Sequence, residues 1–555
     1  MQLERIEIVG FRGIQRLSLD FGEITTLLGE NTWGKSSLLD ALCIALPHNG
    51  QPYSFQIQDF HVNYALSQPQ TQQIQIVTQW RAQNKTEHRS ARYRRLKPIW
   101  IHSHSDEQDD SKRVIFQISA IRNEHKVSTH YQFLDWTGTP LAIHDCEQLA
   151  LELSRLHPVI RLRDARRLHQ HSESITPDSN NKKEKIERRV NNTYRRLSAM
   201  PGHVNKAELK STLNAMQHLI EHYFSFQSQP KNNTREARSN LFTGNTSSTE
   251  SDKDNLIQLL KSNKNHQSKL LLMGLLNAYL QAKGAAEISQ SARPILVLED
   301  PEGRLHPTNL LKSWELLQMI PMQKIVTTNS GILLSAVPFS SIRRLIRQSD
   351  RTLALSIPEH LLSQDELRRI SFHIRFHRPN ALFARCWLLV EGETEVWLFN
   401  ELAKICGYHF PSEGIQLVEF AQSGLKSLIK VAKALNIDWH VVTDGDAAGK
   451  KYATAVRTQL GQDMEKHRLT ELPDKDIENY LYHNGFEKFF RGMISLPENQ
   501  QVPTKKVINR VLKKYAKPDV ALGIVEYCEE HGIDKIPLLI RRILKRVMTM
   551  ANGNS

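Results

Sequence analysis

Residues 295–307 read ILVLEDPEGRLHP, and this stretch decides the fold of the first part of the chain. Residues 295–298 form the short apolar run that is typical of a buried strand in a parallel sheet, and the carboxylates of Glu299 and Asp300 follow at once. At the carboxyl end of such a strand, one acid can hold Mg²⁺ while the next orients an attacking water, which is the arrangement that phosphoryl transfer needs. The stretch therefore requires a phosphate-binding partner elsewhere in the sequence.

The pattern GENTWGKSS at residues 29–37 supplies that partner, because it is a complete GxxxxGKS phosphate-binding loop. Residues 24–28 predict the buried strand that enters the loop, and residues 35–45 predict the helix that leaves it. Backbone N–H groups at the start of this helix can wrap phosphates, while Lys35 reaches the β- and γ-phosphates and the Ser36 hydroxyl ligates Mg²⁺. A chance glycine-rich turn is the alternative. The residues of this loop that we expect to bind ATP are Gly29, Asn31, Gly34, Lys35, Ser36 and Ser37.

The composition limits the number of domains and the kinds of partner that this chain can have. With 555 residues, of which 40% are hydrophobic and 24% charged, the chain is long enough for roughly two to four domains with their own cores. The net charge of +14 favours a polyanionic partner such as nucleic acid, although charge alone leaves this open. The five cysteines have no paired spacing, so neither a disulfide framework nor a zinc site is expected. We expect no membrane association and a cytoplasmic location, because no apolar run approaches the roughly 20 residues of a membrane helix.

Residues 168–255 interrupt the nucleotide-binding fold. They are charged, contain polar low-complexity stretches and predict a helical insertion. An apolar stripe at helical spacing either mediates self-association or packs against the parent domain. The stripe consists of Leu209, Leu213, Met216, Leu219, Ile220 and Tyr223.

A family resemblance follows from the order of these features. The chain resembles the ABC-type ATPase heads of the structural-maintenance, RecF-like and OLD (overcoming lysogenisation defect) proteins. The resemblance is carried by a phosphate loop within the first 40 residues, a helical insertion, the EDPExxLHP pattern, and a strand at residues 323–328 ending at Asn329. The resemblance implies that two ATP molecules bind between two protomers. It also implies that Glu299 is the Mg²⁺-side carboxylate and Asp300 the catalytic one.

Three positions depart from the family pattern. Asp300 stands where the catalytic acid is usually glutamate, and Asn329 stands where a histidine usually contacts the γ-phosphate. Residues 261–269, which should carry a serine-glycine signature, contain no glycine. The sequence therefore predicts ATP binding rather than fast hydrolysis.

A second group of acids lies further along the chain. Residues 386–390 are an apolar strand that ends in EGETE, and residues 440–443 are another that ends in DGD. If the two strands are adjacent and parallel, Glu391, Asp444 and Asp446 share one rim, where their mutual repulsion is tolerable only with a divalent cation between them. The alternative is a pair of solvated strand-end loops.

The pairing of VEGxxE with DGD resembles the TOPRIM domain of topoisomerases, bacterial primases and OLD-family nucleases. Residues 388–395, 420–428 and 441–450 match the OLD version most closely, and together with the head the OLD resemblance spans nearly the whole chain. Primases and topoisomerases are disfavoured, because neither a template-binding module nor a domain with an attacking tyrosine is found.

OLD-type nucleases add a downstream acidic cluster and a lysine, which Glu478 and Lys517 resemble here. The resemblance implies that one metal is held by Glu391, Glu395 and Asp444. It places the second metal on Asp446 and Glu478, while Lys517 neutralises the scissile phosphate. A helix N-terminal acid is the alternative for Glu478, and an ordinary surface lysine is the alternative for Lys517.

The sequence thus predicts an α/β fold, with an ABC-type P-loop ATPase head that carries a helical insertion, then a TOPRIM domain and a basic helical C-terminal section. We expect an OLD-family DNA endonuclease that binds ATP, depends on Mg²⁺ or Mn²⁺, nicks DNA and forms a homodimer or larger oligomer, in DNA repair, DNA processing or phage defence. A RecF-like, ATP-gated DNA-binding protein without nuclease activity is the alternative, and a component that needs an accessory protein partner is a third hypothesis. The expected domains are the head halves at 1–167 and 256–350 around the insertion, or dimerisation arm, at 168–255. A linker at 351–379, the TOPRIM domain at 380–485 and the basic helical C-terminal part of the nuclease domain at 486–555 follow.

Overall fold

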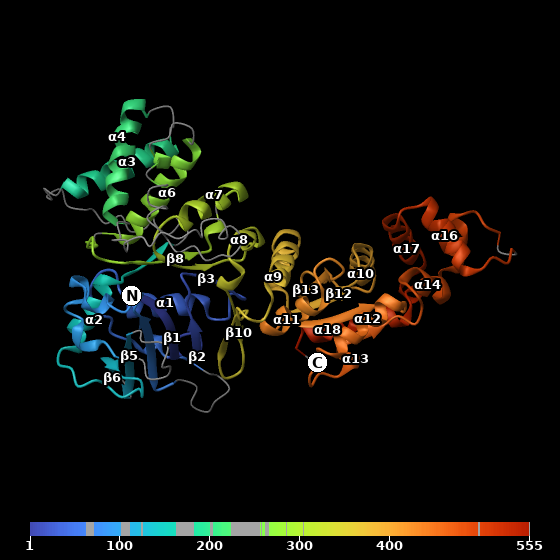
Figure 1. Ribbon diagram of the computed structural model, residues 1–555, viewed down its shortest axis with the longest axis horizontal. Helices are drawn as coiled ribbons and strands as arrows, with labels where there is room; N and C mark the ends of the chain where they lie inside the picture. The colour runs from blue at the N-terminus through green and yellow to red at the C-terminus, as the bar shows by residue number, and fades with distance from the viewer. Residues whose placement is uncertain are drawn as a thin grey trace. The chain divides into compact units, whose positions relative to one another are not determined.

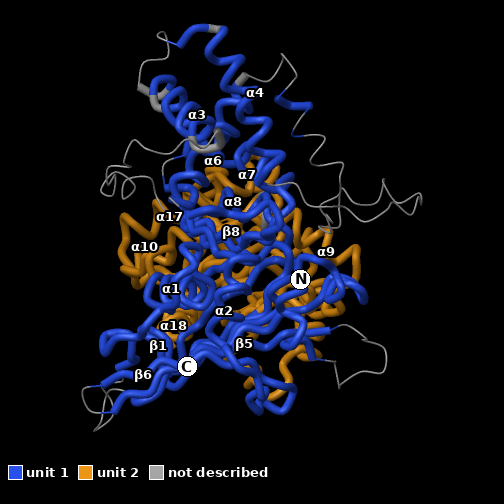
Figure 2. The backbone as a smooth tube through the Cα atoms, turned by 90° about the vertical axis from the view of Figure 1, so that its left-hand side faces the viewer, with its two compact units in different colours: residues 1–355 blue, residues 356–555 orange. Residues whose placement is uncertain are grey.

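The chain forms two compact units in a computed structural model, Met1–Leu355 and Ser356–Ser555 (Figure 2). Within the described ranges, no helix has both the length and the apolar character needed to span a membrane. The structure describes all residues except 63–70, 102–111, 124–125, 163–181, 200–203, 224–255, 257, 261–265, 285, 304, 498–499 and 554–555.

The first unit is built on a mixed sheet whose described strands run in the order β6-β5-β4-β1-β2-β11-β10-β3-β9-β8-β7. The strands from β6 to β2 pair antiparallel, and those from β10 to β7 pair parallel. The antiparallel strands are β1 (Gln2–Phe11), β2 (Ile14–Asp20), β4 (Gln73–Arg81), β5 (Arg113–Asn123) and β6 (Lys126–Leu134). The others are β3 (Ile24–Leu28), β7 (Val159–Leu162), β8 (Ile295–Glu299), β9 (Gln323–Thr327), β10 (Ile342–Arg347) and β11 (Thr352–Leu355).

The parallel half contains the strands that the nucleotide site needs. The strand predicted at residues 24–28 is β3, and the predicted helix is α1 (Lys35–Ala45). Four of the five β3 residues are buried, which is typical of a strand covered on both faces. Because β9 lies between β3 and β8, the phosphate loop that follows β3 and the acids that follow β8 lie on either side of the carboxyl end of β9.

Helices cover this half of the sheet and form the described part of the insertion (Figure 1). Met216, Ile220 and Tyr223 of the apolar stripe are buried, and the Tyr223 hydroxyl donates to Glu187 of α3. The Tyr223 ring also packs against Tyr279 of α6 at 5.5 Å. The stripe therefore packs within the unit, which favours that alternative over self-association. The helices are α2 (Cys146–Leu156), α3 (Lys182–Ala199), α4 (Lys206–Tyr223), α6 (His266–Lys283), α7 (Pro307–Gln318) and α8 (Gly331–Ala336).

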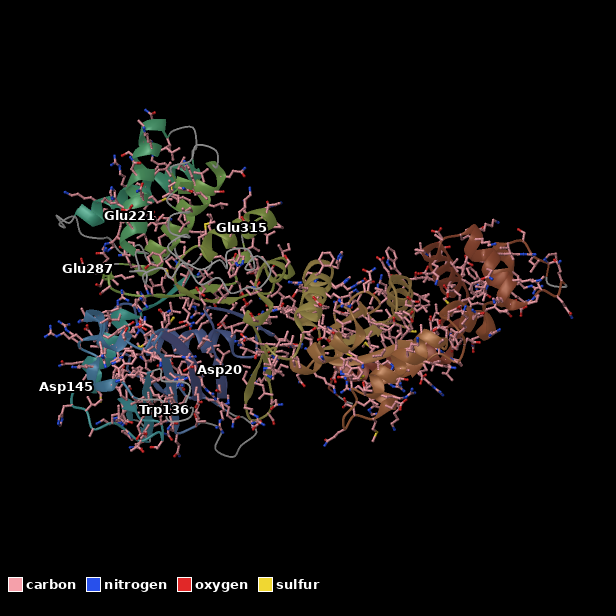
Figure 3. All side chains as sticks on the ribbon, viewed as in Figure 1. Asp20, Trp136, Asp145, Glu221, Glu287 and Glu315 are labelled. Atoms are coloured by element: carbon pink, nitrogen blue, oxygen red, sulfur yellow. The ribbon has the colours of Figure 1, made fainter. Side chains whose placement is uncertain are left out.

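The outer surface of this unit is charged. Trp314 and Leu317 of α7 are buried, whereas Glu315 between them is exposed, as the amphipathic spacing of the helix requires. Asp20 and Asp145 are exposed as well, and all three acids are labelled in Figure 3.

The second unit has a parallel sheet of four described strands in the order β13-β12-β14-β15. These are β12 (Cys386–Val390), β13 (Ile415–Glu419), β14 (Asp438–Thr443) and β15 (Leu469–Glu471). Helices α10 (Glu393–Ile405), α11 (Leu425–Ala434) and α12 (Ala447–Arg457) connect them. Every residue of β12 is buried, which matches the continuous apolar run in its sequence.

Two segments at the borders of this unit have more regular structure than expected. Residues 351–379, expected as a linker, contain α9 (Gln364–Ile370) and the π-helical segment η8 (Ser371–His377). The last helix, α18 (Leu538–Ala551), packs against β12, β13 and β14, and its apolar face belongs to the same core as β12. The C-terminal section is therefore part of this domain's core. The remaining helices of the section include α14 (Ile477–Leu481), α16 (Thr504–Lys514) and α17 (Lys517–His531).

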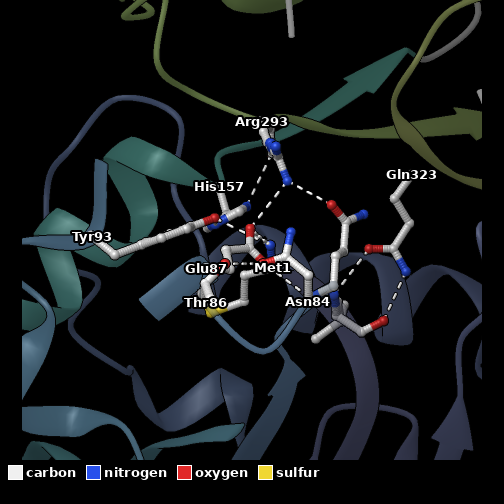
Figure 4. A network of polar contacts seen from close by, with 10 residues as sticks. Met1, Asn84, Thr86, Glu87, Tyr93, His157, Arg293 and Gln323 are labelled. Carbon is white, nitrogen blue, oxygen red and sulfur yellow. Dashed lines mark hydrogen bonds and ion pairs between the residues drawn. The ribbon is translucent and has the colours of Figure 1, made fainter. Parts of the chain in front are cut away.

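A buried ionic network ties the start of the first unit to its parallel half (Figure 4). The carboxylate of Glu87 pairs with the Met1 amine and with Arg293, at 3.1 Å, and accepts a hydrogen bond from the Gln83 N–H at 2.7 Å. Burial alone would raise the pKa of Glu87, but these cations and the N–H hold it below its usual value. Tyr93 and His157 close the network with a 3.0 Å hydrogen bond.

Replacing Glu87 with alanine leaves the buried Met1 amine and the partly buried Arg293 guanidinium without their shared carboxylate. We expect the variant to lose about 3 kcal/mol of unfolding free energy, measured by urea denaturation of the full chain. Glu7→Ala is the matched control, because its pairing partner Arg5 lies at the surface and such pairs contribute at most about 1 kcal/mol. Equal midpoints for the two variants would contradict the expectation.

Candidate nucleotide and metal sites

Lys35 joins the phosphate loop to the tip of β9. Its Nζ donates to the Gly29 carbonyl at 2.7 Å and to Asn329 Oδ1 at 3.0 Å. Burial lowers the pKa of Lys35, and the nearby carboxylates of Asp300 and Glu302 oppose that shift. The residues predicted in the loop, after β8 and at the end of β9 therefore lie around one amine, the Nζ of Lys35. Of the other predicted loop residues, Asn31 and Ser36 are exposed, and Ser37 Oγ accepts from the Gly13 N–H at 3.3 Å.

The acids after β8 are held by the tip of β9. Asp300 adopts the left-handed conformation, with φ of 44°, and its carboxylate accepts from the Thr327 hydroxyl at 3.0 Å. Glu302 accepts from the Asn329 N–H at 2.7 Å and from the Thr328 hydroxyl at 3.0 Å. Glu302 was not among the predicted site residues, although it is the third acid of the EDPE pattern, because the family resemblance assigns roles only to the first two.

Glu299 is paired with an arginine. Nε and Nη2 of Arg161 donate to its two carboxylate oxygens at 2.9 and 2.8 Å, and Nη1 of Arg161 donates to Asp40 of α1. Burial opposes the charge on Arg161, but the two carboxylates raise its pKa. A divalent ion at Glu299 would share this carboxylate with Arg161. The sequence marked Arg161 only as a strand residue, since nothing in the strand pattern reveals which acid faces it.

The second acidic group lies where β12 and β14 end. The two strands are adjacent and parallel, with Leu389 opposite Val441, so both carboxyl ends lie at the same edge of the sheet. Glu391 follows β12 directly and Asp444 follows β14 directly. Asp446 comes next and caps α12 by accepting from the Gly449 N–H at 2.7 Å. We call this cluster, completed by Glu395, Asp476 and Glu478, the acidic rim.

The carboxylates of the acidic rim are close enough to oppose one another's charge. Burial raises the pKa of Asp444 to about 8, and the negative charges of Glu391, Glu395, Asp476 and Glu478 add to the shift. The pKa values of Glu391 and Glu395 are also raised, first by burial and then by neighbouring acids. Oε2 of Glu391 is buried without a hydrogen-bond partner in the described structure. The structure therefore brings together all the acids predicted for this site and adds Asp476.

The predicted lysine reaches the same rim. Lys517 Nζ lies 3.2 Å from Glu478 Oε1, and the Lys517 side chain is 55% exposed while that of Glu478 is 6% exposed. Burial lowers the pKa of Lys517, but the carboxylates of Glu478, Glu395 and Asp476 outweigh burial and raise it above its usual value. Lys517 thus presents a cation between the acids and solvent.

Close backbone contacts explain the two glycines of the DGDAAG turn. A Cβ on Gly445 would lie 2.4 Å from the Asp474 carbonyl oxygen, and one on Gly449 would lie 1.9 Å from that of Asp444. Only glycine allows the turn to pack against these carbonyls. The packing holds Asp444 beside the segment that leads to Glu478.

The acidic rim is composed of donors that suit Mg²⁺ or Mn²⁺, since hard divalent ions prefer carboxylate oxygens. Among the described residues, however, no three His, Cys, Asp or Glu side chains already surround one point as metal ligands do. Glu395 bonds the Gly392 N–H at 3.0 Å, and Asp476 bonds the Asn479 N–H at 2.8 Å. Metal binding would therefore require the side chains of Glu395 and Asp476 to rotate. A bound cation would favour the ionised forms of Glu391 and Asp444, whose pKa values are raised by burial and by neighbouring acids.

These elements define a class of protein, in which a P-loop head of ABC type is joined to a TOPRIM domain, and they confirm the predicted α/β fold. Residues 1–381 match the family described as "Protein of unknown function (DUF2813)", and residues 382–446 match "Overcoming lysogenization defect protein-like, TOPRIM domain". The chain belongs to this DUF2813 family and is an OLD-family protein, which confirms the resemblance drawn from the sequence. It is 41% identical over 561 residues to the Escherichia coli (strain K12) protein named "Uncharacterized protein YbjD", with 100% of both chains covered.

Solved structures align with parts of the chain at low identity. The C-terminal region of the Xanthomonas campestris pv. campestris OLD protein is 16% identical, covers 31% of this chain and 97% of its own, and has a TM-score of 0.26. The SMC head domain from Thermotoga maritima is 12% identical, covers 64% of this chain and 100% of its own, and has a TM-score of 0.31.

The repulsion within the acidic rim predicts opposite effects of Asp444→Asn without and with metal. Without a divalent ion, the variant should unfold at the same temperature as the wild type or higher, because asparagine removes a carboxyl group whose ionisation is opposed by burial and by its neighbours. With Mn²⁺, the wild type should gain stability and the variant should gain less, because ligands that bind only the folded state stabilise it. Calorimetry of the full chain measures both.

Asp438→Asn is the control, because Asp438 begins the same strand at the opposite edge and pairs with Arg468 at 2.8 Å. Its effect should not depend on Mn²⁺. Equal stabilisation of wild type and Asp444→Asn by Mn²⁺ would argue against a metal at the rim.

Proposed function

We propose that this protein is an ATP-binding, divalent-metal-dependent DNA endonuclease of the OLD family that nicks DNA. The observation that carries the proposal is the convergence of Glu391, Asp444 and Glu478 beside an exposed lysine, Lys517. A set of acids that cannot all ionise without a cation, next to a positive side chain open to solvent, suits a phosphodiester substrate.

Each rim residue has a distinct part in this proposal. Mg²⁺ or Mn²⁺ held by Glu391, Glu395, Asp444, Asp446 and Glu478 would supply charge neutralisation and activation of the attacking water. Asp446 is held at the rim by the Gly449 N–H, whereas Glu395 would have to rotate away from the Gly392 N–H to ligate a metal. Lys517 can donate to a non-bridging phosphate oxygen, and its bond to Glu478 keeps it at the rim.

A basic helical face beside the rim supports DNA as the substrate. Val507 and Val511 of α16 are buried, while the opposite face of the helix is exposed and cationic, and the chain then continues to Lys517. Such a face can neutralise successive backbone phosphates. The exposed cations of α16 are Lys505, Lys506, Arg510, Lys513 and Lys514.

The head is proposed to bind ATP with Mg²⁺ through Lys35, Ser36 and Glu299 and to control DNA access or assembly as a homodimer or larger oligomer. Slow hydrolysis follows from the pairing of Asp300 with Thr327 and from Asn329 in the place of a histidine. Roles in DNA repair, DNA processing or phage defence, with or without an accessory protein, are compatible with these chemistries.

Incubating supercoiled plasmid with the protein and Mg²⁺ or Mn²⁺ should yield nicked circles. Asp444→Ala with Asp446→Ala should reduce the nicking rate at least about a hundredfold, because both carboxylates are proposed metal ligands. Agarose gels with and without ATP measure the rate. Lys466→Ala, an exposed charge in the helix that leads into the amino end of β15, is the control and should nick normally. Undiminished nicking by the double variant would defeat the proposal.

The second candidate is a RecF-like, ATP-gated DNA-binding protein in which the TOPRIM domain only binds. The observation in its favour is that the described acids do not yet form a ready ligand set. Under both candidates, Lys35→Ala should weaken binding of a fluorescent ATP analogue by at least about tenfold, because Lys35 is the buried cation of the loop. DNA binding without cleavage that is lost in Lys35→Ala would select the second candidate. Unchanged nucleotide affinity would remove the head's site from both.

A further inference from the structure

The segment between α9 and β12 carries an exposed aromatic cluster. Phe372 of η8 is 54% exposed, and its ring meets those of His373 and His377 edge-on at 5.5 and 5.1 Å. The two imidazole rings stack on each other at 5.8 Å with an interplanar angle of 30°. We call these three side chains the aromatic platform. Short π-helical segments such as η8 occur frequently at functional sites.

The platform lies in a strongly cationic stretch of sequence. Residues 367–390 contain five arginines and neither aspartate nor glutamate. Arg368 and Arg369, in the last turn of α9, are exposed directly before the platform, and Arg368 lies 3.7 Å from Asp365 in the first turn of the same helix. Charge complementarity therefore favours a polyanion as the partner, and the aromatic rings favour a polyanion that also offers flat apolar faces.

The platform adjoins the edge of the sheet that carries the acidic rim. Arg378 Nη2 donates to Glu419 Oε2 at 3.4 Å, and Glu419 is the last residue of β13. In the parallel register, Glu419 lies opposite Val390, which precedes the rim residue Glu391. The Ala421 N–H also donates to the Glu391 carbonyl at 3.3 Å. The platform is thus on the β13 side of the rim, whereas Lys517 and α16 approach through the segments that follow β15.

We propose that an unpaired stretch of a DNA strand binds across this edge, with one base stacked on Phe372 and its phosphates on Arg368 and Arg369. In a duplex, each base face is covered by its neighbours, so an exposed aromatic ring can stack only on a base that is free. The substrate class that follows is single-stranded or locally unpaired DNA. The consequence for cleavage rests on the proposed nuclease function, but the binding itself does not.

Fluorescence anisotropy of the full-length protein with a labelled oligothymidylate, in EDTA, tests the proposal. Phe372→Ala should weaken binding about tenfold, because loss of one base–aromatic stack is worth roughly a factor of ten in affinity. Binding of a blunt duplex of equal length should change by less than about twofold. Phe372→Trp should bind the oligothymidylate like the wild type, and Arg369→Ala should lower the slope of log affinity against log salt by about 0.7.

Met464→Ala is the matched control, since Met464 is 61% exposed and precedes α13 (Glu465–Arg468), which leads into the amino end of β15. It should bind both DNAs normally. The proposal would be overturned if Phe372→Ala bound the oligothymidylate as tightly as the wild type, or if its binding of the duplex fell equally. It would also be overturned if the wild type bound no oligothymidylate, and the platform would then be a site for a protein partner. If Phe372→Ala fails to fold, Phe372→Trp and Arg369→Ala decide. If the protein binds the oligothymidylate through Phe372 but does not nick plasmid, only the nuclease proposal is overturned.

Discussion

The repulsion between carboxylates at the carboxyl edge of β12 and β14 is the constraint on which the second unit depends. Parallel pairing of two buried strands forces Glu391 and Asp444 to the same edge, and burial there raises the pKa of Asp444 to about 8. A protein gains nothing in stability from such a cluster, since each charge opposes the next. The cluster makes physical sense when a divalent cation occupies it during function.

The two acidic sites of the chain solve the same electrostatic problem differently. In the head, Glu299 is neutralised by Arg161, and Glu302 is satisfied by the backbone of Asn329, so this region is balanced by the protein itself. At the acidic rim, Lys517 is the cation that reaches Glu478, and Oε2 of Glu391 is buried without a hydrogen-bond partner in the described structure. The rim therefore has the greater demand for an external cation, which is why we place the DNA chemistry there and a binding or gating role in the head.

Much of this arrangement follows from local sequence. The phosphate loop requires a strand before it and a helix after it, and the helix predicted at residues 35–45 is α1 without a shift at either end. The acids of EGETE and DGD could be placed because strand ends of a parallel sheet share an edge. Arg161 and Glu302 could not, because their partners are set by tertiary packing that no periodicity records. The basic C-terminal section was predicted as a helical part of the nuclease domain, but not that the apolar face of α18 joins the core of β12, since amphipathic spacing does not say which core a helix joins. The domain boundaries and the roles of the site residues stay predictions.

The most direct test of the account is a crystal structure of the protein soaked with Mn²⁺ and recorded at the manganese absorption edge. We predict an anomalous peak within about 2.3 Å of carboxylate oxygens of Glu391 and Asp444. The Asp444→Asn protein under the same conditions should lose it. Ordered density for these side chains with no peak at saturating Mn²⁺, or a peak that persists unchanged in the variant, would contradict the claim that the acidic rim is a divalent-metal site.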